Sequence, residues 1–222
     1  MNLHAKLQER EAQGRPLRLG VIGAGKFATM YIAQVPRTPG VHLLGIADLN
    51  PAYAQANLER TGWAPAHFAA ASLDAALKER RTHLGEDWRA LVQHPAIDIV
   101  IEATGNPLAA VEHALEAFRH GKHVVMVTVE ADAFCGPLLA RKASAAGVVY
   151  SLAYGDQPAL ICDLVDWARA AGFPVVAAGR GHKWQAHYAQ STPETVWGYY
   201  GLTPEQAKIG GLNPKMFNSF LD

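Results

Sequence analysis

The chain alternates short apolar runs with segments in which apolar residues recur every three or four positions. Five of the runs predict buried strands, because continuous apolar residues suit strands that are covered on both faces. They are LRLGVIG (17–23), VHLLGIAD (41–48), IDIVIEATG (97–105), KHVVMVTVE (122–130) and VVYSLAYG (148–155). Strands that alternate with helices form right-handed βαβ units, so the pattern predicts an α/β fold with a parallel sheet.

Caps and breakers set the expected limits of the helices. One helix begins at Lys26 and is stopped by Pro36, and its expected inner face is Phe27, Met30, Tyr31 and Val35. Asn106 caps another, whose expected inner face is Leu108, Val111, Leu115 and Phe118. Between 61 and 95 the pattern is weaker: AHFAA (66–70) is the expected third strand, and SLDAALKERR (72–81) and EDWRALVQHP (86–95) are expected helices.

The composition changes after Gly172. We expect residues 1–172 to form the sheet domain, with an N-terminal helix inside 1–15. Residues 173–222 are rich in Gly, Pro, Trp and Tyr and have little helical period. This segment is the expected start of a second, substrate-side region, and because it ends without a clear capping element we expect it to be incomplete.

The turn after the first strand reads Gly23-Ala-Gly25-Lys-Phe-Ala28, which fits the dinucleotide-binding pattern G-x-G-x-x-G/A. Gly23 permits the tight turn, Gly25 lets a pyrophosphate approach the backbone, and Ala28 lets the helix pack against the strand. Free N–H groups at the start of the helix suit phosphates, so Lys26 and Phe27 complete the predicted turn. The motif predicts a Rossmann-type doubly wound sheet that binds NAD or NADP.

Asp48 lies 20 residues after Ala28, at the end of the next predicted strand. A carboxylate there can accept hydrogen bonds from the adenosine ribose hydroxyls. It would repel a 2′-phosphate, which favours NAD over NADP, but a nearby Arg or Lys can offset that repulsion. The preference between the two cofactors stays open at this point.

Two later strand ends belong to the same expected cleft, because ligands of open parallel sheets bind beyond the carboxyl ends of the strands. Thr104, Gly105 and Asn106 are expected to line the ribose on the nicotinamide side, and Thr128 is expected to bind the cofactor from the next strand. Asn106 has an equally good alternative role as a helix cap. Glu102 is either a buried acid that faces the cofactor or a strand-end residue with a local partner.

Charge and cysteine content narrow the classes of partner. The 222 residues include 20 Lys plus Arg and 20 Asp plus Glu, so no basic excess points to nucleic acid or a membrane surface. Two cysteines without a CxxC pair, a charged first segment and the lack of a long apolar run favour a cytoplasmic protein. The 10 histidines form no metal-binding motif, so no metal is predicted. A small polar substrate is expected, and a homo-oligomer stays open.

Several segments together resemble the homoserine-dehydrogenase-like oxidoreductases. They are GVIGAGKF, GIADLNP, IDIVIEATG, GKHVVMVTVEAD, SLAYGDQPALICDLVDWAR and NPKMFNSFLD. More narrowly they resemble a branch that includes deoxyxylulose-phosphate-reductoisomerase-like enzymes and carries a C-terminal SAF domain. The resemblance implies an NAD(P)-dependent enzyme. It also implies that family members are longer, so we expect this chain to lack the rest of the catalytic region and the SAF domain.

One position departs from that resemblance. Homoserine dehydrogenases carry a lysine after the fifth strand, whereas this chain has TVEAD with Glu130 in its place. Lys183 and Lys215 are candidates to supply the missing ammonium as electrophile or acid, although either can equally be a solvated surface lysine. Glu130 stays a third catalytic candidate. Arg180 and Ser219, with the two lysines, are candidates to bind a substrate phosphate.

Three functions remain from the sequence. The leading one is an NAD(P)-dependent oxidoreductase that moves a hydride to or from a carbonyl or alcohol carbon of a small polar metabolite. The second is a reductoisomerase that converts deoxyxylulose phosphate into methylerythritol phosphate. The third is a dinucleotide-binding module without turnover, which the missing lysine favours.

Overall fold

The structure is a computed structural model that describes residues 2–154, 157–179, 185–209 and 212–219. Five of these are described without their side chains: Lys26, Gln157, Pro158, Met216 and Ser219. The chain forms two compact units, Met1–Leu164 and Val165–Asp222. The boundary falls inside the long helix that follows the last strand.

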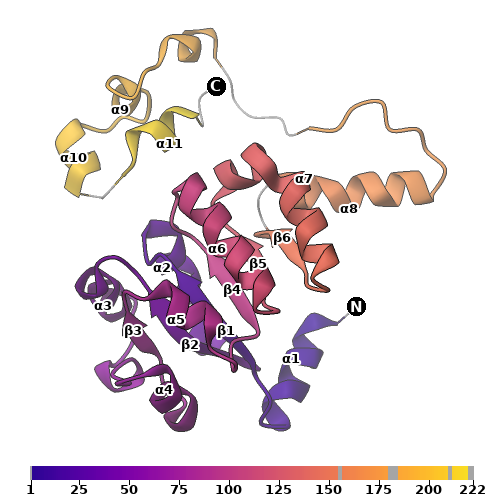
Figure 1. Cartoon of the computed structure of the whole chain (residues 1–222). Helices are drawn as coiled ribbons and strands as arrows, with labels where there is room; N and C mark the ends of the chain where they lie inside the picture. The colour runs from indigo at the N-terminus through magenta and orange to yellow at the C-terminus, as the bar shows by residue number, and fades with distance from the viewer. Residues whose placement is uncertain (1, 155–156, 180–184, 210–211, 220–222) are drawn as a thin grey trace. The chain divides into compact units, whose positions relative to one another are not determined.

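The first unit is built on a six-stranded sheet in the order β3-β2-β1-β4-β5-β6, with every neighbouring pair parallel (Figure 1). The strands are β1 (Leu17–Ile22), β2 (Val41–Ala47), β3 (His83–Gly85), β4 (Ile99–Glu102), β5 (His123–Met126) and β6 (Tyr150–Leu152). This is the strand order of a doubly wound Rossmann fold. The predicted α/β class and parallel sheet are therefore confirmed.

Helices cover both faces of the sheet. The helices that pack on it are α2 (Lys26–Ile32), α3 (Pro51–Arg60), α4 (Leu73–Glu79), α5 (Trp88–Gln93), α6 (Pro107–Arg119) and α7 (Val129–Ala145). Two further helices are α1 (Leu3–Ala12), which has no buried residue, and α8 (Gln157–Ala170), which contains the boundary between the units. One core cluster joins the sheet to α4, α5, α6 and α7, and a second joins it to α2 and α3. Because both faces are covered, the central strands are mostly apolar, which is why the sequence predicted them.

The helix faces agree only in part with the expected ones. Val35 is buried and Tyr31 packs against the second core cluster, as expected, whereas Phe27 and Met30 are 46% and 58% exposed. The buried residues of α2 itself are Ala28, Thr29 and Ile32. The helix ends at Ile32, and Pro36 lies in a short 3-10 turn (Val35–Arg37) instead of stopping it.

The inner face of α6 is as expected except for Leu108, which is 73% exposed. Phe118 is buried, and Val111 and Leu115 pack against the first core cluster beside the buried Ala110, Ala114 and Ala117. Small and large apolar side chains therefore share the buried face, and the size of an apolar residue did not by itself identify it.

The third strand was predicted in the wrong place. Residues Pro65–His67 form a 3-10 turn, and β3 is instead His83–Gly85, to which Ala70 adds only an isolated bridge. A three-residue edge strand that contains a histidine and a glycine leaves too little pattern to be read. The strand predicted over 122–130 is also shorter, since β5 ends at Met126 and α7 begins at Val129.

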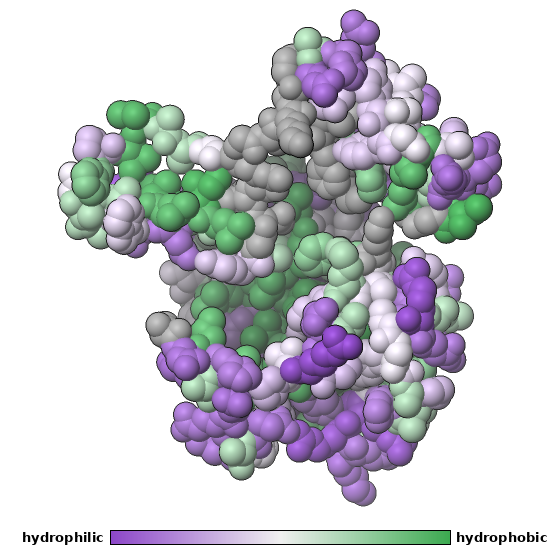
Figure 2. Space-filling view, turned by 180° about the vertical axis from the view of Figure 1, so that it is seen from behind, coloured by the Kyte–Doolittle hydropathy of each residue, from purple (hydrophilic) through white to green (hydrophobic). Residues whose placement is uncertain are grey.

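The second unit has short helices. After a 3-10 turn (Ala186–Gln190) come α9 (Val196–Tyr199), α10 (Pro204–Ile209) and α11 (Pro214–Ser219). Its small core is Val196, Trp197 and Ala207, against which Leu202, Phe217 and three other apolar side chains pack. The helices in the described ranges are each too short or too polar to cross a bilayer. Figure 2 shows one face of the molecule, on which many side chains are hydrophilic.

Candidate dinucleotide-binding site

Strand register brings the predicted cofactor residues to one edge of the sheet. Ile22, the last residue of β1, pairs with Ala47 of β2 and with Glu102 of β4. The glycine turn, Asp48 and the segment after Glu102 therefore leave the sheet side by side. The strand order reverses at β1 between β2 and β4, and such a switch point is where open α/β sheets bind ligands.

Gly23 is required by its surroundings. Its φ is +90°, in the region that L side chains rarely adopt. A Cβ at this position would lie 2.8 Å from the carbonyl carbon and oxygen of Ala103. The turn can therefore pass the end of β4 only with a residue that has no side chain.

Gly25 has a different role, because its backbone is ordinary. Its φ is −69° at the N-cap of α2, and a Cβ there would meet no atom within 4 Å. The space above the turn is open, and as in any α-helix the N–H groups of the first turn of α2 have no intrahelical acceptor. A side chain would fill this cradle, so the residues present fit a pyrophosphate. The side chain of Lys26 lies outside the described atoms, and that of Phe27 is exposed.

Two side chains hold the residue between the glycines. Asp48 Oδ2 accepts a hydrogen bond from Ala24 N (2.7 Å), and Asp48 Oδ1 accepts one from Asn50 N (2.8 Å). Asn57 Nδ2 in α3 donates to Ala24 O (2.8 Å). Asp48 is half-buried, so its carboxylate is fixed at the end of β2 and each oxygen keeps acceptor capacity for a ribose hydroxyl. Sequence reasoning missed Asn57, because its burial and its partner in the glycine turn depend on how α3 packs.

Glu102 lies at the centre of a buried polar cluster. Its carboxylate is 0% exposed. Oε1 accepts from Thr104 Oγ1 (2.6 Å) and contacts His113 Nδ1 (3.2 Å), and Oε2 accepts from Thr128 Oγ1. The structure therefore gives Glu102 local partners, which is the second of the two roles considered for it.

The other predicted residues of the loop after β4 have defined roles in holding it. Asn106 Oδ1 accepts from Leu108 N and Ala109 N (both 3.2 Å), so it caps α6 as expected. Gly105 has φ +69° and donates its N–H to Thr128 Oγ1 (3.0 Å). Thr128 is only 2% exposed, whereas Thr104 is exposed.

The catalytic candidates are spread over both units. Glu130 is exposed in the first turn of α7, in the first unit. Lys215 is exposed in α11, in the second unit, where its main-chain N–H donates to Asn213 Oδ1 (3.0 Å). Lys183 and Arg180 lie outside the described residues, as does the side chain of Ser219.

Asp132, two residues after Glu130, binds a tyrosine of the last strand. Tyr150 Oη donates to Asp132 Oδ1 (2.8 Å). Burial, followed by this hydrogen bond, raises the pKa of Tyr150 well above its ordinary value. α7 is kinked at Cys135, just before Pro137, and Gly136 sits where any Cβ would collide with the Asp132 carboxylate.

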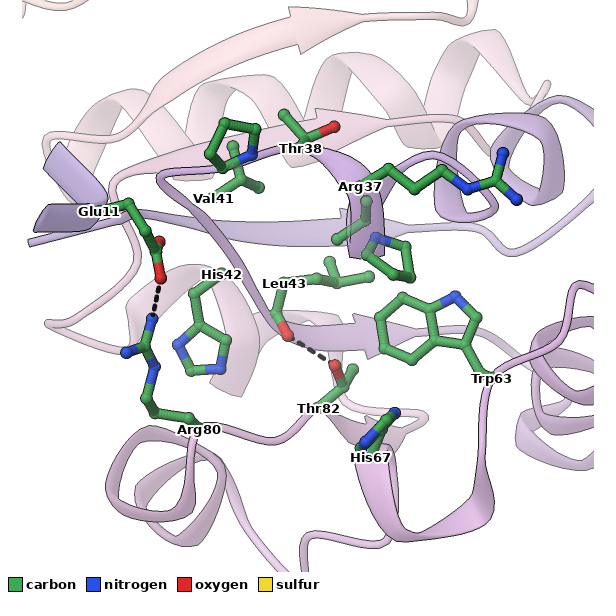
Figure 3. Close-up of a pocket in the computed structure, with 13 residues that line it drawn as sticks. Glu11, Arg37, Thr38, Val41, His42, Leu43, Trp63, His67, Arg80 and Thr82 are labelled. Atoms are coloured by element: carbon green, nitrogen blue, oxygen red, sulfur yellow. Dashed lines mark hydrogen bonds and ion pairs between the residues drawn. The ribbon is translucent and has the colours of Figure 1, made fainter. Parts of the chain in front are cut away.

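A cavity of about 540 Å³ lies elsewhere in the first unit, where β2 begins (Figure 3). Trp63 and His67 line one side, and Arg80 pairs with Glu11 at the other (3.1 Å). The cavity lies at the amino end of β2, whereas ligands of open parallel sheets bind at the carboxyl ends of the strands. It is therefore separate from the site at the glycine turn. In the described part of the chain, no group of three or more His, Cys, Asp and Glu could hold a metal ion.

Comparison with known families gives two matches. Residues 17–127 match the family described as "Oxidoreductase family, NAD-binding Rossmann fold". The chain belongs to this oxidoreductase family. Residues 155–222 match the domain described as "Oxidoreductase DRL, catalytic domain". The first match covers the glycine turn, Asp48 and the loop after β4, so this unit is an NAD(P)-binding Rossmann domain.

Solved structures are similar to this chain at low identity. A probable dehydrogenase from Thermotoga maritima is 17% identical with a TM-score of 0.50, covering 70% of this chain and 41% of its own. A homoserine dehydrogenase from Thiobacillus denitrificans is 24% identical with a TM-score of 0.49, covering 70% and 34%. A Synechocystis biliverdin reductase, solved with biliverdin and NADP+, is 21% identical with a TM-score of 0.47, covering 70% and 42%. The chain thus spans between 34% and 42% of the length of these three structures. A search of curated proteins finds no match.

Proposed function

We propose that this chain is the cofactor-binding part of an NAD(P)-dependent oxidoreductase that acts on a carbonyl or alcohol carbon of a small polar metabolite. The observation that carries the proposal is the glycine turn in its family context. Gly25 leaves an open cradle above the backbone, and Asp48 presents a fixed carboxylate at the end of the next strand. These are the two features that a dinucleotide needs for its pyrophosphate and its adenosine ribose.

Each end of the dinucleotide has its own set of residues in this proposal. Gly23, Gly25 and the main chain of 26–28 hold the pyrophosphate, and Asp48 holds the adenosine ribose. Thr104, Gly105 and Asn106 line the ribose on the nicotinamide side. The cofactor, when bound, supplies or accepts the hydride.

The same Asp48 carboxylate makes NAD the proposed cofactor over NADP. It is held by two main-chain N–H groups and cannot turn away from the position that a 2′-phosphate would take. The negative charges of the Asp48 carboxylate and of the 2′-phosphate repel each other, so NADP should bind more weakly than NAD.

The proton donor for the substrate is proposed to come from the second region. Glu130 occupies the place at which homoserine dehydrogenases, which the chain resembles, carry a lysine, and a carboxylate cannot stabilise an alkoxide as an ammonium does. Lys183 and Lys215 are the proposed sources of that ammonium. Glu130 remains the candidate to accept or deliver a proton on the Rossmann side.

A second candidate reaction is reductoisomerisation of a sugar phosphate. Residues 155–222 match a catalytic domain that has a family description of its own. This match and the missing lysine both support the assignment of the chain to a branch separate from homoserine dehydrogenases. Arg180, Lys183, Lys215 and Ser219 are then the proposed phosphate-binding residues. Consumption of reduced cofactor with deoxyxylulose phosphate, but not with homoserine-type substrates, would favour this candidate.

Titration with NADH and NADPH, followed by fluorescence of the bound cofactor, tests the proposal. Gly25→Val should weaken NADH binding at least about tenfold, or about 1.4 kcal/mol, because the side chain fills the cradle. Gly198→Val is the matched control, since a Cβ at Gly198 also meets no atom within 4 Å. Wild-type protein that is folded but gives no saturable signal with either cofactor would overturn the proposal. Saturable binding without turnover of any carbonyl or alcohol would instead favour a dinucleotide-binding module.

A further inference from the structure

Glu102 is a fully buried acid with no assigned role, at the end of the strand beside the glycine turn. Its two carboxylate oxygens receive three side-chain contacts, from Thr104, Thr128 and His113. Thr104 N lies a further 3.3 Å from Oε1. A buried carboxylate is strongly disfavoured unless such donors surround it, so the cluster is built around this group.

The directions of these hydrogen bonds are fixed by chemistry. A carboxylate only accepts, so both threonine hydroxyls must give their single hydrogen to Glu102. Each hydroxyl oxygen then accepts from the main chain of the loop. Gly105 N donates to Thr128 Oγ1 (3.0 Å), and Asn106 N donates to Thr104 Oγ1 (3.2 Å). The carboxylate therefore holds residues 104–106 through two threonines.

The third contact fixes the outer end of the cluster. Because Glu102 Oε1 can only accept, His113 Nδ1 carries the hydrogen. His113 is buried in α6, and its ring packs against Trp88 with 4.4 Å between ring centroids. The carboxylate is thereby tied to the helix that Asn106 caps, so the loop is held at both of its ends.

We propose that Glu102 is a positioning residue for the nicotinamide half of the bound dinucleotide, an inference that rests on the proposed function. The hydrogen-bond directions leave the hydroxyl of Thr104, an exposed residue, with acceptor capacity alone. Thr104 therefore accepts from a hydroxyl of the second ribose and does not donate to a phosphate. Thr128 is too buried to touch the cofactor and acts by holding Gly105.

Three ligands of decreasing length test this division. ADP stops at the pyrophosphate, ADP-ribose adds the second ribose, and NADH adds the nicotinamide. Glu102→Gln replaces one acceptor oxygen with an NH₂ donor, which turns one threonine hydroxyl away from its loop N–H. We expect the Kd values of NADH and ADP-ribose to rise about tenfold and that of ADP to stay within about twofold. Glu112→Gln on the exposed side of α6 is the control and should change none of the three.

Each outcome of this experiment leads to a different conclusion. Equal weakening of all three ligands would show that Glu102 only stabilises the fold, and no change in any of them would show that it does not position the loop. Either result overturns the inference while leaving the proposed function intact. If wild-type protein binds none of the ligands, the proposed function itself fails.

A pair of substitutions at Thr128 repeats the test without changing a charge. Thr128→Val keeps the shape and removes the hydroxyl, whereas Thr128→Ser keeps the hydroxyl. We expect valine to weaken NADH and ADP-ribose several-fold with ADP unchanged, and serine to restore wild-type binding. Equal affinities in the valine and serine variants would overturn the inference, even if Glu102→Gln does not fold.

Discussion

The glycine turn after β1 and the loop after β4 lie side by side at one edge of the sheet and are built in opposite ways. The turn is shaped by the lack of side chains: Gly23 passes within contact of Ala103, and Gly25 leaves open space. The loop is shaped by a buried anion, Glu102, which acts through Thr104 and Thr128. We therefore expect the glycine turn to be damaged by substitutions that add a side chain. The loop after β4 should instead be damaged by substitutions that remove a hydrogen bond to Glu102.

Breaking the turn at its tightest point should have the largest effect. Gly23→Ala would place a Cβ against the Ala103 carbonyl and force an alanine to a φ of +90°. We expect a loss of about 3 kcal/mol or more in the free energy of unfolding, measured by urea denaturation.

Gly62→Ala separates the two causes of that loss. Gly62 also has positive φ, at +87°, but a Cβ there meets no atom within 4 Å. Its loss should be about 1–2 kcal/mol, which is the cost of the backbone conformation alone. If both variants lose the same amount, the contact with Ala103 does not limit the turn.

A substitution at Asp48 tests how the turn selects its cofactor. Asp48→Asn keeps an oxygen that can accept from Ala24 N and removes the negative charge. We expect NADH to bind about tenfold more weakly and NADPH to bind as well or better, because the repulsion of a 2′-phosphate is gone. The measurement is the ratio of the two Kd values. If the variant and wild type have the same ratio of Kd values for NADH and NADPH, Asp48 does not discriminate between the two adenosine riboses.

Alkaline pH should produce a smaller effect on stability, through two tyrosines of the first unit. Burial raises the pKa of Tyr31, in the helix after the glycine turn, to about 12, and burial also raises that of Tyr150 on β6. A phenol whose pKa is higher in the folded state holds its proton after the unfolded chain has lost it. The contribution of these protonated tyrosines to the free energy of unfolding is therefore fully present below a pH of about 10. It is lost as the pH rises toward 12.

Tyr31→Phe removes one of these titrations, so its free energy of unfolding should fall less between pH 9 and 11.5 than that of wild type. Tyr53→Phe, in the exposed part of α3, is the matched control and should follow the wild-type curve. Identical slopes for all three proteins would show that Tyr31 is not protected in the folded state. Tyr150→Phe extends the comparison to the side of β6.

Most of the fold was predictable because its signals are local. The apolar runs predicted five of the six strands, and Asn106 caps a helix as expected. The third strand was misplaced because β3 is short and lies at the edge, where few apolar residues are needed. Part of each helix face was misjudged, since Phe27, Met30 and Leu108 are exposed whereas the smaller Ala28 and Ala110 are buried.

Of the candidate site, the sequence determined the half that depends on backbone freedom. Gly23, Gly25 and Asp48 are recognisable because a tight turn, a bare main chain and a carboxylate at the next strand end need those residue types at that spacing. The hydrogen bonds of Asn57 and Glu102 were decided by the tertiary structure. Apart from Thr104, two positions from Glu102, and Arg60, three positions from Asn57, the partners lie 11 to 33 positions away in the chain. Only strand register and helix packing bring such distant groups within hydrogen-bond distance.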